Sequence, residues 1–492
     1  MGSISASEPA GAARLIALPA VQAAVFAVVA LILRWSSFGD PNIMSDETFY
    51  QTVGLAMHHG ALPYVDVWDR KPLGLFLIYW AITGISASPV AYQLAAAASA
   101  AATALVIARI ALRWTGTQGA VLAGGLYLVW LTPLFGFGGQ APVFYNLLVA
   151  AAALLVLRAR RRLERGGGSL DASLAMVFAG SAITVKTSAV FEGVYFGLAL
   201  LAASLRSNEP LAWIVARTAR WVLLGALPTL LIAGWYGWIG HWPEWWHAMV
   251  TANLAKGGDW ASTSLRLVLL TRLILPMVLA AAAGLLLMRG EDLVFPAGWL
   301  LAALVGMAAI PNFYPHYALP LLVVLCVCAA PVLGRGLYGI VAAVILAGLG
   351  IHAESPFRPG QAAQSARTFA ELAAAIRAHD GSRGLLVYAG PSQLYPMTGN
   401  PLPTPLAFET HLSQGIERNV SHLDTVAELR RVLAKRPGAV VVPVQVRNGP
   451  VIPETWAMVN AYVRTNCRPV LQRRVDDWLL ADDLVVWGDC RR

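Results

Sequence analysis

Six charged side chains are grouped in the segment 42–80: Asp46, Glu47, Asp66, Asp69, Arg70 and Lys71. Only 13% of the residues in this chain are Asp, Glu, Lys or Arg, whereas 57% are hydrophobic, so a plain connecting loop would not be expected to carry so many charges. Carboxylates and cations held together suit a displacement in which a carboxylate accepts a hydroxyl proton and a cation binds a phosphate. We therefore take this segment as the candidate reaction centre.

The first two carboxylates also have a purely structural explanation. Asp46 and Glu47 precede a run, 48–58, that can form a short helix, and acidic residues at a helix start are favoured by the helix dipole alone. The dipole does not account for the second acidic group, which is followed at once by Arg70 and Lys71. The pairing of two such groups favours a reaction centre over a capped helix.

Apolar runs long enough to cross a bilayer surround this segment. They are 15–33, 90–111, 119–135, 142–158, 172–187, 189–204, 218–239, 264–287, 293–310, 317–333 and 337–351. Lipid offers no hydrogen-bond partner to the backbone, so such runs must be helices. We predict an all-α polytopic membrane domain of about eleven transmembrane helices over residues 1–352. The first run ends without a signal-cleavage site and is taken as a retained helix.

The aromatic run 73–86 is short for a span and is predicted to lie in the membrane interface. This reading puts the arginine-rich loops on the cytoplasmic side, as the positive-inside rule requires. Five segments then face the opposite compartment and could build one site: 34–89, 136–140, the Trp-rich loop 241–262, 312–316 and everything after 352. The net charge of +9 is explained by the same loops, so nucleic acid is not an expected partner.

Residues 353–492 have the composition of a small soluble α/β domain, which this topology makes periplasmic. Helices are predicted over 365–379, 425–435 and 456–465, and strands over 384–389, 439–444 and 479–487. Their alternation favours a largely parallel sheet, and no nucleotide-binding motif is present. Cys467 and Cys490 could pair in an oxidising compartment, whereas Cys326 and Cys328 lie in a span and are predicted to be packing residues.

Three stretches together resemble the C-type glycosyltransferase superfamily, in the branch of the protein O-mannosyltransferases and the lipid A aminoarabinose transferase. They are SDETFY with LAMHHGALPYVDVWDRKPLG (45–74), GSAITVKTSAVFEG (180–193) and NFYPHYALPLL (312–322). The resemblance covers the membrane part, about 1–350. It implies transfer of a sugar from a polyprenyl-phosphate donor to a hydroxyl of a lipid, glycan or protein acceptor. The reaction would take place at the outer face of the bacterial inner membrane, usually with inversion.

By matching position, the resemblance makes Asp46 the general base and gives Glu47 the task of orienting it or of assisting a metal ion. Lys71 would hold the carrier phosphate. No cofactor is required, and a divalent metal ion is left open. The other predicted substrate-binding residues are Tyr64, Asp69, Arg70, Lys186, His316 and Tyr317.

The sequence departs from the family pattern at Leu73, which replaces a second proline, and at Gln140, where many relatives have an acidic residue. Lys186 and His316 also have ordinary explanations, as a snorkelling lysine and an interfacial histidine. The alternative function is a secondary transporter or lipid flippase, although transporters usually place ionisable residues near the bilayer midplane. A non-enzymatic assembly protein is a third reading that the C-terminal domain permits.

Overall fold

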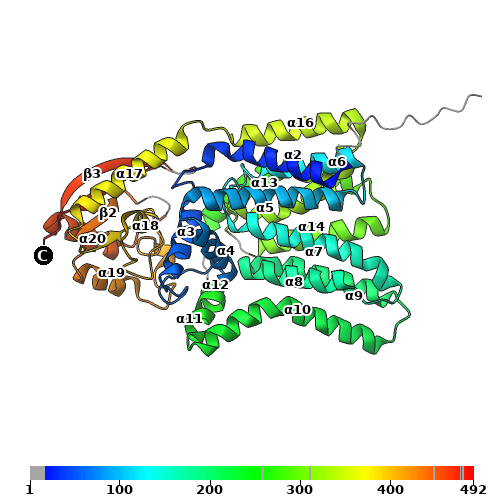
Figure 1. Ribbon diagram of the computed structural model, residues 1–492, viewed down its shortest axis with the longest axis horizontal. Helices are drawn as coiled ribbons and strands as arrows, with labels where there is room; N and C mark the ends of the chain where they lie inside the picture. The colour runs from blue at the N-terminus through cyan, green and yellow to red at the C-terminus, as the bar shows by residue number, and fades with distance from the viewer. Residues whose placement is uncertain are drawn as a thin grey trace, which may run out of the picture.

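A helical bundle carries a smaller mixed domain at one of its ends (Figure 1). The computed structural model describes residues 17–255, 260–309, 312–446, 449–476, 478 and 481–491. Residues 15–16, 310 and 479–480, which belong to predicted elements, lie outside the described residues. Within the described part, the prediction of a helical membrane domain followed by a small α/β domain is confirmed.

Each predicted span corresponds to one described helix. These helices are α2 (Pro19–Arg34), α5 (Pro89–Ala111), α6 (Thr117–Trp130), α7 (Ala141–Glu164), α8 (Leu170–Val185), α9 (Val190–Leu205), α10 (Leu211–Trp238), α13 (Trp260–Leu285), α14 (Glu291–Ala308), α15 (Leu319–Leu333) and α16 (Gly336–Ala353). Among the described residues, eight helices are long and apolar enough to cross a membrane. Three of the eight, α2, α9 and α15, reach this length together with an adjoining 3-10 turn, whereas α6, α8 and the apolar part of α14 (Asp292–Ala308) fall short of it.

The bundle is organised around α15. In its apolar window 78% of the residues are buried, against 11% for α10. Helix α15 packs against α5, α6, α7, α13, α14 and α16, whereas α10 packs against α8 and α9 near the edge of the bundle. The apolar side chains that α10 leaves exposed suit contact with lipid.

Small residues let neighbouring helices approach closely. A Cβ on Gly180 of α8 would lie 2.1 Å from the Gly225 carbonyl oxygen of α10, and one on Gly284 of α13 would lie 1.9 Å from the Cys328 carbonyl oxygen of α15. Such contacts are typical of membrane helices, where apolar burial alone gives no preference for protein over lipid. Cys326 and Cys328 are buried free thiols, as predicted for packing residues.

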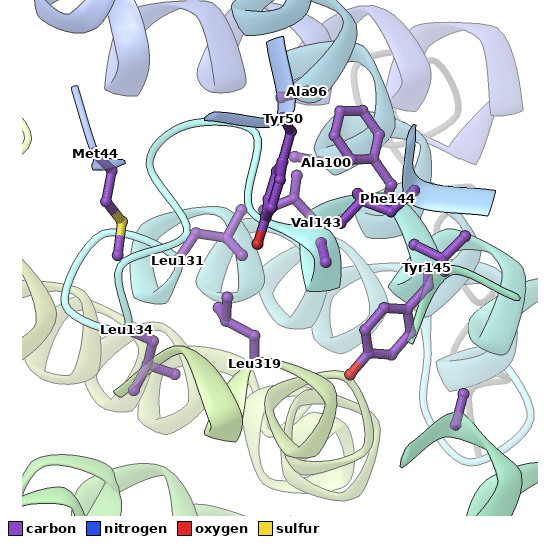
Figure 2. Close-up of a cluster of buried hydrophobic side chains, with 14 of the residues drawn as sticks. Met44, Tyr50, Ala96, Ala100, Leu131, Leu134, Val143, Phe144, Tyr145 and Leu319 are labelled. Atoms are coloured by element: carbon purple, nitrogen blue, oxygen red, sulfur yellow. The ribbon is translucent and has the colours of Figure 1, made fainter. Parts of the chain in front are cut away.

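Helix α3 (Ser45–His58) is fixed against this bundle by buried apolar side chains. Figure 2 shows Tyr50 of α3 near Ala96 and Ala100 of α5 and Val143 of α7, with Leu319 of α15 in the same cluster. These residues come from four different helices. The start of α3, which carries the predicted base, is therefore held by the core of the bundle.

Helix α4 (Leu73–Ile85) follows the charged loop. Its 13 residues give a length of about 20 Å, which is less than the hydrocarbon core of a bilayer. It packs against α3, α5 and α8, and it lies at the end of the bundle that carries the C-terminal domain (Figure 1). Both features fit the predicted interfacial helix.

The C-terminal domain contains helices on a four-stranded sheet. Its helices are α17 (Gln361–His379), α18 (Leu394–Thr398), α19 (Thr425–Ala434) and α20 (Pro453–Asn466), and its strands are β1 (Leu385–Val387), β2 (Ala439–Pro443), β3 (Arg468–Asp476) and β4 (Ala481–Gly488). The strand order is β1-β2-β4-β3. The three predicted helices and three predicted strands are all present.

The prediction of a largely parallel sheet is wrong. Strands β1 and β2 are parallel, but β4 is antiparallel to both β2 and β3. Strand β3 was not predicted, because this edge strand leaves most of its residues exposed or half-buried and carries no alternating apolar pattern. A short connection between β3 and β4 requires an antiparallel hairpin. The predicted pairing of Cys467 and Cys490 is present, as a disulfide across the two outer ends of this hairpin.

The two domains meet through specific contacts beside the charged loop. Trp68 N donates a hydrogen bond to the Pro405 carbonyl oxygen at 2.9 Å, and Phe137 stacks on Trp478 with ring centroids 4.3 Å apart. Arg70 forms an ion pair with Glu417, with 2.5 Å between Nη2 and Oε1. The C-terminal domain therefore contacts the loop that carries the predicted site.

Candidate active site

The carboxylates of the first turn of α3 make contacts far away in the sequence. The N-cap residue is Met44, and its side chain makes no capping hydrogen bond. Asp46 and Glu47 instead contact Lys71 and the turn 136–140. A capped helix start would not need these contacts, so the purely structural explanation is incomplete.

Asp46 lies between a cation and an amide. Its Oδ1 is 3.5 Å from Lys71 Nζ, and its Oδ2 accepts a hydrogen bond from Gln140 Nε2 at 3.3 Å. Burial alone would raise the pKa of this carboxyl, but the charge of Lys71, followed by that of His316, lowers it to about 2. Asp46 is therefore ionised at neutral pH. Gln140, noted above as a departure from the family pattern, contacts this carboxylate directly.

Glu47 is fully buried against the glycine turn. Its Oε2 accepts a hydrogen bond from Gly139 N at 2.6 Å, and a Cβ on Gly138 would lie 2.0 Å from that oxygen, so a larger residue there would displace the carboxyl group or the turn. Arg34 at the end of α2 holds the other side of the turn by donating to the carbonyl oxygens of Gly136 at 2.5 Å and Gly138 at 3.2 Å. Burial raises the pKa of Glu47 to about 8. The two adjacent carboxyl groups therefore differ in charge at neutral pH.

Lys71 is presented by a rigid loop. Tyr64 Oη donates a hydrogen bond to the Lys71 carbonyl oxygen at 2.9 Å, and Asp69 Oδ1 accepts hydrogen bonds from Arg70 N at 2.5 Å and from Lys71 N at 3.2 Å. Burial would lower the pKa of Lys71, but the Asp46 carboxylate raises it above its usual range. Its ammonium also lies 5.2 Å from the centre of the Tyr50 ring. Lys71 is thus a half-buried, charged group held by its contacts with Asp46 and Tyr50.

A cavity of about 540 Å³ opens beside this loop. It is lined by side chains from the loop, from the end of α8, from the 312–317 segment and from the C-terminal domain. Five of the predicted site residues line it: Asp69, Arg70, Lys71, Lys186 and Tyr317.

The remaining predicted residues lie near this cavity. Lys186 follows the last residue of α8, and its Nζ is 4.9 Å from the centre of the Tyr317 ring. His316 contacts Tyr317 with ring centroids 4.6 Å apart and lines a second, smaller cavity together with Lys186 and Glu192. Tyr64 is fully buried and supports the loop through its bond to Lys71. Segments from four parts of the sequence thus converge on one place.

Several lining residues were missed by the sequence analysis. Phe408, His411 and Glu417 come from an irregular part of the C-terminal domain, where no motif or periodicity signals them. Asn253 lies in the Trp-rich loop, which was expected to face the same compartment. Among the described residues, no group of three or more His, Cys, Asp or Glu side chains is arranged to hold a metal ion. The need for a metal ion is left open.

Comparisons with known proteins support the architecture. No protein-family model and no curated protein matches the sequence. Among solved structures, ArnT from Cupriavidus metallidurans bound to undecaprenyl phosphate matches with a TM-score of 0.58 and 15% identity, over 94% of this chain and 97% of that chain. The same protein in the apo state gives a TM-score of 0.57 at 15% identity, over the same shares of the two chains.

A more distant likeness is to the archaeal oligosaccharyltransferase AglB from Archaeoglobus fulgidus, in complex with an inhibitory peptide and a dolichol-phosphate. It has a TM-score of 0.47 and 12% identity, and the match covers 86% of this chain and 69% of that one. At such identities the likeness concerns the fold. The match to ArnT extends over both domains, and the predicted resemblance to the C-type glycosyltransferases is confirmed at the level of architecture.

Proposed function

We propose that this chain is a membrane glycosyltransferase that moves a sugar from a polyprenyl-phosphate donor to a hydroxyl acceptor. The observation that carries the proposal is the Asp46–Lys71 pair beside a cavity of about 540 Å³. A base for a hydroxyl proton and a cation for a phosphate are thereby held together. The fold shared with an ArnT structure that binds undecaprenyl phosphate supports the choice of donor.

In this reaction the oxygen of the acceptor hydroxyl attacks the anomeric carbon of the donor sugar. Asp46 accepts the proton that this hydroxyl loses. The bond from that carbon to the phosphate oxygen breaks, and polyprenyl phosphate leaves with the bonding electrons. Lys71 and Lys186, which both line the cavity, stabilise the negative charge on the leaving phosphate. A single displacement of this kind inverts the anomeric configuration.

Donor binding would also activate the base. A carboxylate with a pKa of about 2 is a weak proton acceptor, and the attraction to Lys71 is the main cause of that low value. A donor phosphate bound beside Lys71 partly neutralises the positive charge of the Lys71 ammonium. Lys71 then lowers the pKa of Asp46 by less. The pKa of Asp46 then rises toward a range that suits general-base catalysis, and only when the donor is in place.

Glu47 acts as a positioning residue in this scheme. Its carboxyl group is buried and fixes the 136–140 turn through Gly139 N. The same turn ends in Gln140, which holds Asp46. Glu47 thus sets the orientation of the base through the backbone.

The proposed site faces the periplasm of a bacterial inner membrane. In Figure 1 the C-terminal domain, α3 and α4 lie at one end of the bundle, and the loop that joins α7 to α8 lies at the other. That loop follows the arginine cluster at the end of α7, which includes Arg160, Arg161, Arg162 and Arg165. Positive loops stay in the cytoplasm, so the opposite end with its disulfide is assigned to the periplasm.

Binding of undecaprenyl phosphate to the purified full-length chain in lipid nanodiscs tests the proposal. We expect native mass spectrometry to detect the bound lipid in the wild-type chain and to show at least a tenfold weaker binding in Lys71→Ala. Lys435→Ala is the matched control, because Lys435 is an exposed lysine of the C-terminal domain. Equal binding by all three proteins would contradict the assigned phosphate site. In a separate experiment, mass spectrometry of envelope glycans from a deletion strain identifies the sugar and the acceptor.

A further inference from the structure

We propose that the C-terminal domain supplies the acceptor subsite, in which Phe408, His411 and Glu417 bind a sugar ring. The hydroxyl that receives the transferred sugar then belongs to a saccharide rather than to a peptide. This inference rests on the proposed transferase function and specifies the substrate class of the same cavity. It starts from polar atoms that the protein itself does not satisfy.

His411 is a buried side chain with an unused polar atom. It is 5% exposed, it lines the cavity, and its Nδ1 has no hydrogen-bond partner within the described part of the chain. Its ring lies 5.2 Å from that of Phe408 and 6.4 Å from that of Phe49, and these contacts fix its orientation. An unpaired polar atom on a side chain that lines a cavity carries a free-energy cost that a ligand can remove.

The imidazole is neutral at the pH of the cell. Burial lowers the pKa of His411 to about 4, and the attraction of Glu417 does not outweigh this effect. A neutral imidazole has one donor and one acceptor nitrogen. This combination matches a hydroxyl group, which can donate and accept at once, and it offers no charge to a phosphate.

Glu417 adds a second acceptor on the same side of the cavity. Its side chain is 10% exposed; Oε1 pairs with Arg70, and Oε2 is buried without a hydrogen-bond partner among the described residues. The Arg70 pair holds the carboxylate in place and leaves Oε2 unpaired. Phe408 contributes an apolar ring to the lining. Two unpaired polar atoms beside an aromatic ring match the hydroxyl groups and the apolar face of a sugar ring.

The two walls of the cavity therefore suit different parts of the substrates, phosphate on one side and hydroxyl groups on the other. Lys71 and Lys186 on the membrane-domain wall suit the carrier phosphate, whereas Glu417 on the C-terminal-domain wall, paired with Arg70, offers a phosphate no free cation and can accept hydrogen bonds from hydroxyl groups. A single serine or threonine hydroxyl offers no apolar face to Phe408, whereas a sugar ring offers both hydroxyl groups and such a face. The cavity volume of about 540 Å³ lies in the usual range for sites that enclose a small ligand.

The test compares binding of methyl glycosides with binding of a short serine-containing peptide, both measured by saturation-transfer NMR on the full-length chain in nanodiscs. The principal variant is His411→Phe, which keeps a ring against Phe49 and Phe408 but removes both nitrogens. Loss of one neutral hydrogen bond should weaken glycoside binding by about threefold to tenfold. His411→Gln keeps a donor and an acceptor and should recover part of the affinity. His379→Phe, at the end of α17 and outside the lining of the cavity, is the matched control and should bind as the wild type does.

Undecaprenyl phosphate binding is measured on the same samples. Retained lipid binding together with weaker glycoside binding in His411→Phe supports the subsite. Unchanged glycoside affinity in that variant, absence of glycoside binding by the wild type, or a preference for the peptide would overturn it. If no sample binds the lipid while the wild type binds glycosides through His411, the transferase proposal fails and the sugar subsite stands.

Discussion

Lys71 Nζ lies 3.5 Å from Asp46 Oδ1, although Asp46 lies in the first turn of α3 and Lys71 in the loop before α4. The proposed proton acceptor and the proposed phosphate-binding group therefore form one ion pair. A change in charge at Lys71 therefore shifts the pKa of Asp46, and a change in charge at Asp46 shifts the pKa of Lys71.

Asp46→Asn should abolish most of the transfer activity. Loss of a general base usually lowers the rate by about 10²- to 10⁴-fold, and the isosteric amide keeps the hydrogen bond to Gln140 available. Turnover is measured with purified protein and donor lipid extracted from the native membrane. Binding of undecaprenyl phosphate should survive, and Asp66→Asn, in the same loop, serves as the control. Near-normal turnover by the Asp46 variant would remove this residue from the mechanism.

Lys71→Ala should move the acid limb of the pH profile upward. Lys71 is the main group that lowers the pKa of Asp46 to about 2, so its removal lets burial raise that pKa. The base is active only when ionised, so residual kcat/KM of the variant should fall at a higher pH than that of the wild type. Lys71→Arg should keep the acid limb near the wild-type position and restore only part of the activity, because guanidinium needs a different geometry. Coincident acid limbs in the alanine variant and the wild type would refute the coupling.

Gly138→Ala should disrupt the site through Glu47. The new Cβ would lie 2.0 Å from Glu47 Oε2, so the turn or the carboxyl group must move, and Gln140 with it. We expect at least a tenfold loss of turnover and a lower midpoint of thermal unfolding. Gly125→Ala in α6 is the control, because a Cβ there has no heavy atom within 4 Å and alanine is the better helix former by about 0.5–1 kcal/mol. Equal activity of the two variants would show that the turn tolerates movement.

The membrane bundle could be predicted from the sequence because lipid leaves the backbone few choices. All eleven predicted spans have a corresponding helix, including the short α6 and α8. The C-terminal sheet was harder, since water permits many backbone solutions. Strand β3 has three arginines and an exposed face, so the sequence contains no apolar pattern that would reveal it.

The residues of the candidate site also differ in whether the sequence alone reveals them. Asp46, Lys71 and Lys186 were found because local motifs around them resemble a known family. His411 lies in a turn and Glu417 ends a single 3-10 turn (Gly415–Glu417), and only the docking of the two domains brings them to the cavity. Tyr64 was predicted to bind substrate. Its buried hydroxyl donates a hydrogen bond to the Lys71 carbonyl oxygen, and this contact could be predicted only if the conformation of the loop were known.

The C-terminal domain should be accessible from the periplasm. A phosphatase fused after Arg492 should be active in intact cells, whereas one fused in the 164–170 loop should be inactive. An inactive C-terminal fusion would mean that the number of spans differs from eleven and would separate the loop of Asp46 from the assigned compartment. In the wild-type chain, non-reducing peptide mass spectrometry should also find Cys467 linked to Cys490.

Asp40 should make the folded protein less stable as the pH rises from about 4 to about 6. Burial raises the pKa of this carboxyl to about 6, although the neighbouring Ser365, Asn42 and Trp478 lower it somewhat. The folded state therefore binds a proton more tightly than the unfolded chain does. The free energy of unfolding decreases across this window, and the cost of the buried charge is fully present above it.

Asp40→Asn removes this titration and should flatten the stability profile between those pH values. Two pKa units correspond to about 2–3 kcal/mol at neutral pH, which the variant should partly regain because its amide can still accept the hydrogen bond from Asn42 N. Thermal unfolding of both proteins from pH 4 to pH 8 measures the difference. Parallel profiles would mean that another group carries the pH dependence at the junction of the two domains.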